Sequence, residues 1–342
     1  MFGQTLAIAW NTFSESIRQP VVLVMIVVAT LLIVLSNPFA AFTMEDDQRM
    51  YIDIALSTVF IVSIILSAFL ATNVLNREIE NRTVLTVVSK PVSRIVFVLG
   101  KYLGVAGALL LTILCLSFVF MLVERHGTLP TLASPYHKPV LAFGLGGLAA
   151  GVGVAVWTNY FYGRSFPSAV LLATTPLLAV AYLLSLFFKH DFSPTPIATS
   201  FRLDLWLAVL AMTLGVMVLT AVAVAASTRL GQVLTLAITL GLFMAGMLSD
   251  WLFGRTIARL SDLFDRTQAS PATFDADHVL LWFSKIGYAV VPNFQVFWLS
   301  DALTQRRPIP LSYIAEIVPY GLVYVVVALA AAVALFERRE VG

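Results

Sequence analysis

The chain is short of charge. Only 12% of its 342 residues are Asp, Glu, Lys or Arg, whereas 59% are hydrophobic. A typical soluble domain has about 25% charged and about 45–50% apolar residues, so this composition does not suffice to cover a water-soluble globule of this length. It excludes a soluble enzyme and a disordered chain, and it predicts a protein embedded in a lipid bilayer.

Cysteine is nearly absent as well. A single residue, Cys115, excludes an intrachain disulfide and a cysteine metal cluster. The four histidines, His126, His137, His190 and His278, are expected in loops, so no metal site is predicted. The 21 Lys and Arg nearly balance the 19 Asp and Glu, so the charge predicts no nucleic-acid partner.

A phosphate-binding loop and buried charges are missing too. Gly100-Lys101 is suggestive, but Ile95 stands where such a loop needs its first glycine, and Tyr102 stands where it needs Ser or Thr. No Asp, Glu, Lys or Arg lies near the middle of a long apolar run, so ion-coupled transport and intramembrane hydrolysis have no obvious carrier or base. We expect no catalytic residue and no cofactor on this chain.

Long apolar runs are what the chain has in abundance. Eight runs of 20 or more residues lack Asp, Glu, Lys and Arg, and each is long enough for a helix to cross the bilayer. The runs are apolar all round, which disfavours a membrane β-barrel. The sequence therefore predicts an all-α integral membrane protein with about eight transmembrane helices. The runs are 19–44, 54–76, 102–123, 139–163, 165–188, 205–228, 230–249 and 317–336.

Two pairs of runs are separated by one arginine each, Arg164 and Arg229. Each pair predicts a tight helical hairpin with a cation at its turn, and a pair of shorter re-entrant segments is the alternative. The spacings Gly100-xxx-Gly104 and Gly147-xxx-Gly151 predict close helix packing rather than ligand binding.

Residues 1–19 predict an amphipathic helix in the membrane interface. Phe2, Leu6, Trp10, Phe13 and Ile17 recur every three or four residues, and polar residues lie elsewhere around the helix. Trp10 is expected at the depth of the lipid headgroups.

The remaining chain divides into three parts. Residues 20–249 hold transmembrane helices one to seven and the charged inner segment 76–94; residues 250–312 form an extracytoplasmic segment; and residues 313–342 hold the last helix and a cytoplasmic tail. With both termini inside, the inner segments carry 10 Lys and Arg and the short outer loops carry 5. This excess predicts cytoplasmic termini, since long loops such as 250–312 are largely exempt from the rule.

Segment 250–312 contains two features. Charged residues alternate with apolar ones after Trp251, which predicts an amphipathic helix at the outer surface. The uncharged stretch Ile286–Ser300 is too short to span comfortably and is interrupted by Pro292, which suggests a re-entrant segment. Two interpretations stay open: it caps the exit of a transport path, or it is a folded loop without contact to cargo.

Segment 76–94 carries the densest charge in the chain. A short helix would present Glu78, Glu80 and Arg82 to the cytoplasm, Pro91 would end it, and Ser93 is placed to cap the next helix. Spacing alone leaves open a rigid docking element and a simple charged turn, and slightly favours the turn.

These motifs resemble the corresponding loop of ABC-2 type permeases, the membrane subunits of bacterial ATP-driven exporters. The resemblance is closest to the group named for multi-copper enzyme maturation, although many family members have six spans rather than eight. It is carried by the interfacial N-terminal helix and by Glu78-x-Glu80-x-x-Thr83, Ser89-x-Pro91-Val92-Ser93-Arg94, Lys101-Tyr102-x-Gly104, Val291-Pro292-Asn293-Phe294 and Leu335-Phe336-Glu337-Arg338-Arg339-Glu340.

The resemblance implies a permease that couples ATP hydrolysis on an ABC ATP-binding subunit to substrate translocation across the bacterial cytoplasmic membrane. ATP and Mg would reside on that partner, and a second permease, identical or related, would complete the complex. Coupling residues would be Glu78, Glu80, Arg82, Thr83, Pro91, Arg94 and Lys101, and the outer re-entrant residues would be Pro292, Asn293 and Phe294. The alternative is a non-transporting membrane scaffold that binds a cytoplasmic partner through 76–94.

Overall fold

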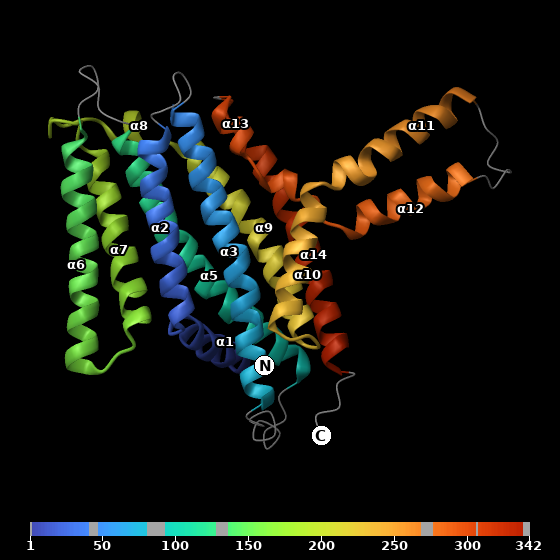
Figure 1. Cartoon of the computed structure of the whole chain (residues 1–342), viewed down its shortest axis with the longest axis horizontal. Helices are drawn as coiled ribbons and strands as arrows, with labels where there is room; N and C mark the ends of the chain where they lie inside the picture. Colours follow the sequence, from blue (N-terminus) through green and yellow to red (C-terminus); the bar gives the residue numbers. More distant parts are fainter. Residues whose placement is uncertain are drawn as a thin grey trace.

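The computed structural model describes residues 2–40, 47–80, 93–127, 136–267, 276–305 and 307–337. The long helices form a bundle in which their axes are roughly aligned. A helical hairpin projects from one side of the bundle (Figure 1). Helix α1 (Phe2–Ile17) lies across one end of the bundle, where α14 (Leu311–Glu337) also finishes. We call this end the α1 end and the other the opposite end.

In the part of the chain that the structure describes, seven helices are long and apolar enough to cross a membrane, and an eighth is added if a bent pair counts as one span. The predicted all-α membrane fold with about eight spans is therefore confirmed. The seven are α2 (Pro20–Ala40), α3 (Asp47–Glu80), α5 (Arg94–His126), α6 (Lys138–Tyr162), α7 (Phe166–Leu186), α9 (Leu203–Ser227) and α14.

Helices α3, α5 and α9 form the centre of the bundle. In the most apolar stretch of each, about two thirds or more of the residues are buried, against 17% in α6. Because helices in lipid gain little from burying apolar surface, close packing favours small side chains, and a small polar side chain can be buried there when its hydroxyl is hydrogen-bonded within its own helix. Buried hydroxyls, among them those of Ser63, Thr72, Thr112 and Thr220, donate to the carbonyl four residues earlier.

The predicted hairpin at Arg164 is present. Gly163 ends α6 with a φ of 64°, in the left-handed region that glycine tolerates best, and the chain turns directly into α7. Along the hairpin, a Cβ added at Gly151 would lie 2.7 Å from Thr174 Oγ1, and one at Gly147 would lie 3.1 Å from the Leu177 carbonyl oxygen. The Gly147-xxx-Gly151 spacing therefore serves close helix packing, as predicted.

The seventh predicted span is not straight. Helix α10 (Gln232–Met247) ends two residues before the apolar run does, and the pair formed with the next helix is bent by 52°. Its 16 residues extend about 24 Å, which is shorter than the hydrocarbon core of about 30 Å. A π-helical turn, η1 (Asp250–Gly254), connects α10 to the predicted amphipathic helix, α11 (Arg255–Thr267).

Helix α11 and the following α12 (Ala276–Val290) form the projecting hairpin of Figure 1. The chain then returns to the bundle through η2 (Phe294–Phe297) and α13 (Ser300–Thr304) before α14 begins. A four-residue helix, α8 (Ile197–Ser200), lies between α7 and α9 at the opposite end.

Candidate functional site

The predicted coupling segment begins as a continuation of α3. That helix extends to Glu80, so Glu78 and Glu80 belong to its last turn and not to a separate short helix. Arg82, Thr83 and Pro91 lie outside the described residues. Arg94 is the first residue of α5, and Ser93 caps this helix because its Oγ accepts a hydrogen bond from the Val96 amide at 3.4 Å. The predicted cap is therefore confirmed.

Helix α1 is present as predicted, and its buried face differs from its exposed apolar face. Small residues, among them Thr12 and Ser16, are fully buried. Of the predicted apolar stripe, Phe2, Leu6 and Trp10 are 85%, 60% and 68% exposed, whereas Phe13 is partly buried and Ile17 is buried. The face that contains these small residues, which we call the small face, therefore packs on the protein, whereas Phe2, Leu6 and Trp10 remain available to lipid.

The small face of α1 lies in a groove on α5 that we call the glycine groove, formed by Gly100, Gly104 and Gly107. A Cβ at Gly100 would lie 2.7 Å from Ile8 Cβ, and one at Gly104 would overlap Thr12. The Gly100-xxx-Gly104 spacing thus permits close contact between two helices, as predicted, and the structure identifies the partner as α1.

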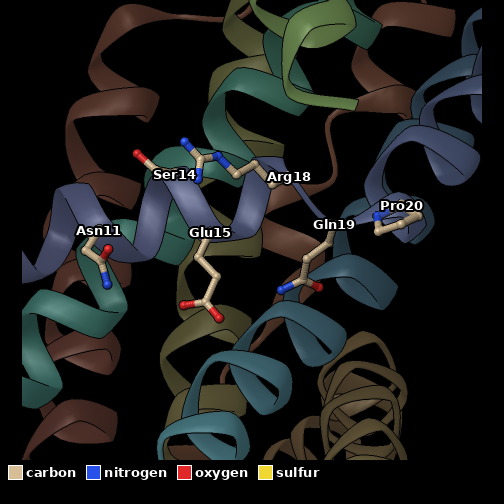
Figure 2. Close-up of a pocket in the computed structure, with 6 residues that line it drawn as sticks. All are labelled: Asn11, Ser14, Glu15, Arg18, Gln19 and Pro20. Atoms are coloured by element: carbon tan, nitrogen blue, oxygen red, sulfur yellow. The ribbon is translucent and has the colours of Figure 1, made fainter. Parts of the chain in front are cut away.

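The corner between α1 and α2 is tied to α3. Gln19, only 6% exposed, accepts a hydrogen bond at its Oε1 from Asn73 Nδ2 at 3.0 Å. A cavity of about 330 Å³ lies along this corner. Figure 2 shows that Ser14 and Arg18 extend from one side of α1, whereas Glu15 and Gln19 point to the other. Helix α1 therefore contacts both helices that flank segment 76–94.

Lys101 lies inside the protein. Its side chain is 1% exposed, and Nζ lies 5.5 Å from the centroid of the Phe97 ring. That ring stacks on Phe336 of α14, with 5.4 Å between centroids. Arg94 is exposed, whereas Lys101 is enclosed within the bundle.

The predicted outer residues lie in a segment that we call the outer turn, residues 291–299. Phe294 and Phe297 are fully buried, and this depends on glycines in α10 and α9. A Cβ at Gly246 would overlap Phe294, and one at Gly215 would lie 3.2 Å from Phe297 Cβ. The outer turn is thus inserted between the helices, since Phe297 lies against Gly215 and Gly321, well inside α9 and α14, and it does not lie loosely on the surface.

Hydrogen bonds hold the outer turn from several sides. Asn293 donates through Nδ2 to Asp250 Oδ1 at 3.2 Å, and its backbone amide donates to the Tyr320 hydroxyl of α14 at 2.8 Å. Gln295 Nε2 donates to the Met247 carbonyl at 2.7 Å. Immediately afterwards, Ser300 Oγ donates to Asp53 Oδ1 of α3 at 2.7 Å. The turn therefore connects α10, α14 and α3.

Sequence reasoning missed a polar cluster at the opposite end. The Arg125 guanidinium donates to the carbonyls of Ser185 at 3.0 Å and Phe188 at 2.8 Å, and Glu124 pairs with Arg202. These residues lie at the edges of the apolar runs, which was the available signal, but their partners are distant in sequence. Among the described residues, no three His, Cys, Asp or Glu side chains gather as they would around a metal ion.

Residues 17–166 match the family model described as ABC-2 family transporter protein. The matched range covers α2, α3, α5 and α6 together with the segment between α3 and α5. This match confirms the resemblance to ABC-2 type permeases, although it does not reach the outer turn. No curated protein matches the chain.

Proposed function

We propose that this chain is the membrane-spanning permease subunit of an ABC-2 type exporter. It couples ATP hydrolysis on an ABC ATP-binding subunit to movement of a substrate across the bacterial cytoplasmic membrane, with the α1 end facing the cytoplasm. The family match over residues 17–166 supports a permease component of an ABC transporter. A second permease, a copy of this chain or a related one, completes the complex.

One observation carries the coupling part of the proposal. Segment 76–94 joins α3 to α5, α1 is packed into the glycine groove of α5, and the corner after α1 is hydrogen-bonded to α3 through Gln19 and Asn73. A displacement of this segment would therefore move α1, α3 and α5 together. A partner protein shifts a conformational equilibrium of the permease only if it binds the two conformations with different affinity. ATP binding to the partner can act through such a contact at segment 76–94, so no charged residue inside the membrane is needed.

In this proposal the residues of the segment have different roles in coupling. Glu78, Glu80, Arg82 and Thr83 contact the ATP-binding subunit, and Pro91 separates this contact from α5. Arg94 begins the helix that receives the movement. Lys101, buried beside Phe97, transmits it to neighbouring helices.

The outer turn is the proposed cap of the substrate path. The outer turn contacts α10 and α14 through Pro292, Asn293 and Phe294. Separation of these two helices would therefore remove the contacts of the outer turn. The buried position of Phe294 supports a cap that is packed into the bundle. The alternative is a folded outer loop without contact to cargo.

Charge reversal tests the coupling contact. The chain is purified with its candidate ATP-binding subunit, and the double variant Glu78→Lys/Glu80→Lys is compared with Asp191→Lys, which changes an exposed carboxylate between α7 and α8. We expect the double variant to lose at least tenfold in affinity for the partner or in permease-stimulated ATP turnover, and Asp191→Lys to keep both.

Unchanged binding and turnover in the double variant would contradict the coupling role. Loss of binding without any substrate translocation by the wild-type complex would instead favour the scaffold. Substrate-dependent ATP turnover in reconstituted vesicles separates these two outcomes.

A further inference from the structure

A second cavity lies between α1 and the turn that joins α6 to α7. Its volume is about 600 Å³, and its lining comes from α1, the turn and the first residues of α7. Both walls contribute an arginine, Arg18 from the end of α1 and Arg164 from the turn. Ser14, Ser165 and Ser168 add hydroxyl groups.

The lining carries positive charge without a carboxylate. No Asp or Glu lines the cavity, and among the described residues neither the Arg18 nor the Arg164 guanidinium donates a hydrogen bond or joins an ion pair. In Figure 2, Arg18 extends along the side of α1 that bears Ser14, while neighbouring Glu15 points to the other side. Two guanidinium groups facing one space favour an anion, and their planar donors match phosphate oxygens.

The rest of the lining is apolar. Phe13, Ile17 and Leu172 lie beside the arginines, and Trp10 completes the α1 wall with 68% of its surface exposed. A free phosphate ion in water gains nothing from such a wall. A phospholipid gains from both parts, because the phosphate meets the arginines and the glycerol and acyl carbons meet the apolar side chains.

The depth of the cavity is that of a lipid headgroup. The last turn of α6, directly before Gly163, exposes Trp157, Tyr160, Phe161 and Tyr162, each by more than half. Exposed Trp and Tyr at the end of a span are typical of the interface between hydrocarbon and water. Helix α1 lies at the same end of the bundle (Figure 1).

We propose that this cavity binds the headgroup of an anionic phospholipid from the leaflet in which α1 lies. A lipid bound there would fasten the α6–α7 hairpin to α1, and through α1 to α5, the helix that carries the glycine groove. This site is independent of the contact between segment 76–94 and an ATP-binding subunit.

Native mass spectrometry of the full chain tests the proposal, with dioleoylphosphatidylglycerol titrated into detergent micelles. A Lys or Arg near an anionic lipid surface contributes to the binding free energy, and loss of one such residue weakens lipid binding by about fivefold. We expect Arg18→Gln and Arg164→Gln each to weaken the first binding event about fivefold and the double variant about 25-fold. Arg18→Lys and Arg164→Lys, which keep the charge, should weaken it less than the Gln variants.

The matched control is Arg229→Gln, at the turn between α9 and α10, where the Arg229 Nε donates to the Leu335 carbonyl. It should leave lipid binding unchanged. Equal weakening by Arg229→Gln would overturn the site, since it would indicate general surface charge. Displacement of the lipid by millimolar inorganic phosphate or glycerol phosphate would identify a free-phosphate site and overturn the lipid assignment. Equal affinity for dioleoylphosphatidylcholine would overturn the preference for anionic lipid.

Discussion

Gly104 shows what a single missing side chain permits. It lies where α1 crosses α5, and a Cβ there would overlap Thr12. We predict that Gly104→Leu destabilises the α1–α5 contact by about 1–3 kcal/mol, the usual penalty for overpacking a tight contact. Hydrogen–deuterium exchange should then become faster in residues 2–17, because local opening of α1 requires less free energy.

The control for this prediction is Gly146→Leu. Gly146 lies in α6, where nothing is within 4 Å of an added Cβ. Exchange in α1 should match wild type in that variant. Equal exchange in the Gly104 and Gly146 variants would show that the glycine groove does not hold α1.

His137 is a second residue whose environment decides its chemistry. Burial, then the charge of Arg125, lowers the pKa of the His137 imidazole to about 4. In this neutral form its Nδ1 accepts a hydrogen bond from the Val140 amide and caps α6. The unfolded chain, with a histidine pKa of about 6.5, binds more protons between these values. The contribution of His137 to the free energy of unfolding should therefore be fully present above a pH of about 6.5 and decrease as the pH falls toward about 4.

NMR titration of labelled histidine measures this shift directly. The His137 signal, assigned by its loss in His137→Asn, should titrate near pH 4. Asn also caps helices, so the variant should fold and lack this part of the acid sensitivity. A midpoint near the ordinary histidine value would contradict the prediction.

At the scale of elements, the outer turn depends on two buried rings. Phe294→Ala removes a fully buried ring between the turn and α10, and we expect a loss of about 3–5 kcal/mol from the cavity that remains. Thermal unfolding in detergent should shift down clearly. Phe283→Ala, in the projecting helix α12, removes a ring that is 67% exposed and should have little effect. Similar shifts for both variants would mean that the outer turn does not stabilise the bundle.

At the scale of the whole molecule, the direction of insertion is a prediction from charge. If the α1 end faces the cytoplasm, a cysteine at Asp265 in α11 should react with an impermeant maleimide added outside intact cells. A cysteine at Arg229, between α9 and α10, should react only after the membrane is opened. Both are made in a Cys115→Ser background, whose native thiol is buried. Labelling of Asp265→Cys from the cytoplasmic side alone would reverse the topology.

Much of the architecture follows from the sequence alone. Charge-free runs of sufficient length predict membrane helices because an unpaired charge or backbone group in hydrocarbon is too unfavourable to tolerate. The N-terminal helix, the Ser93 cap and the hairpin at Arg164 follow from local patterns, which depend on residues a few positions apart. The motifs between Glu78 and Gly104, which carry part of the family resemblance, are also local patterns that the sequence shows directly.

Tertiary structure decided which of these patterns meet. A glycine spacing signals a close approach but does not name the approaching helix, so the partners of Gly104 and Gly246 appear only once α1 and the outer turn are placed. Arg18 and Arg164 are separated by most of the first half of the chain, and nothing local indicates that they line one cavity. The bend after Met247 is likewise visible only in the structure, because continuous hydrophobicity specifies that a segment is apolar and not where its helix turns.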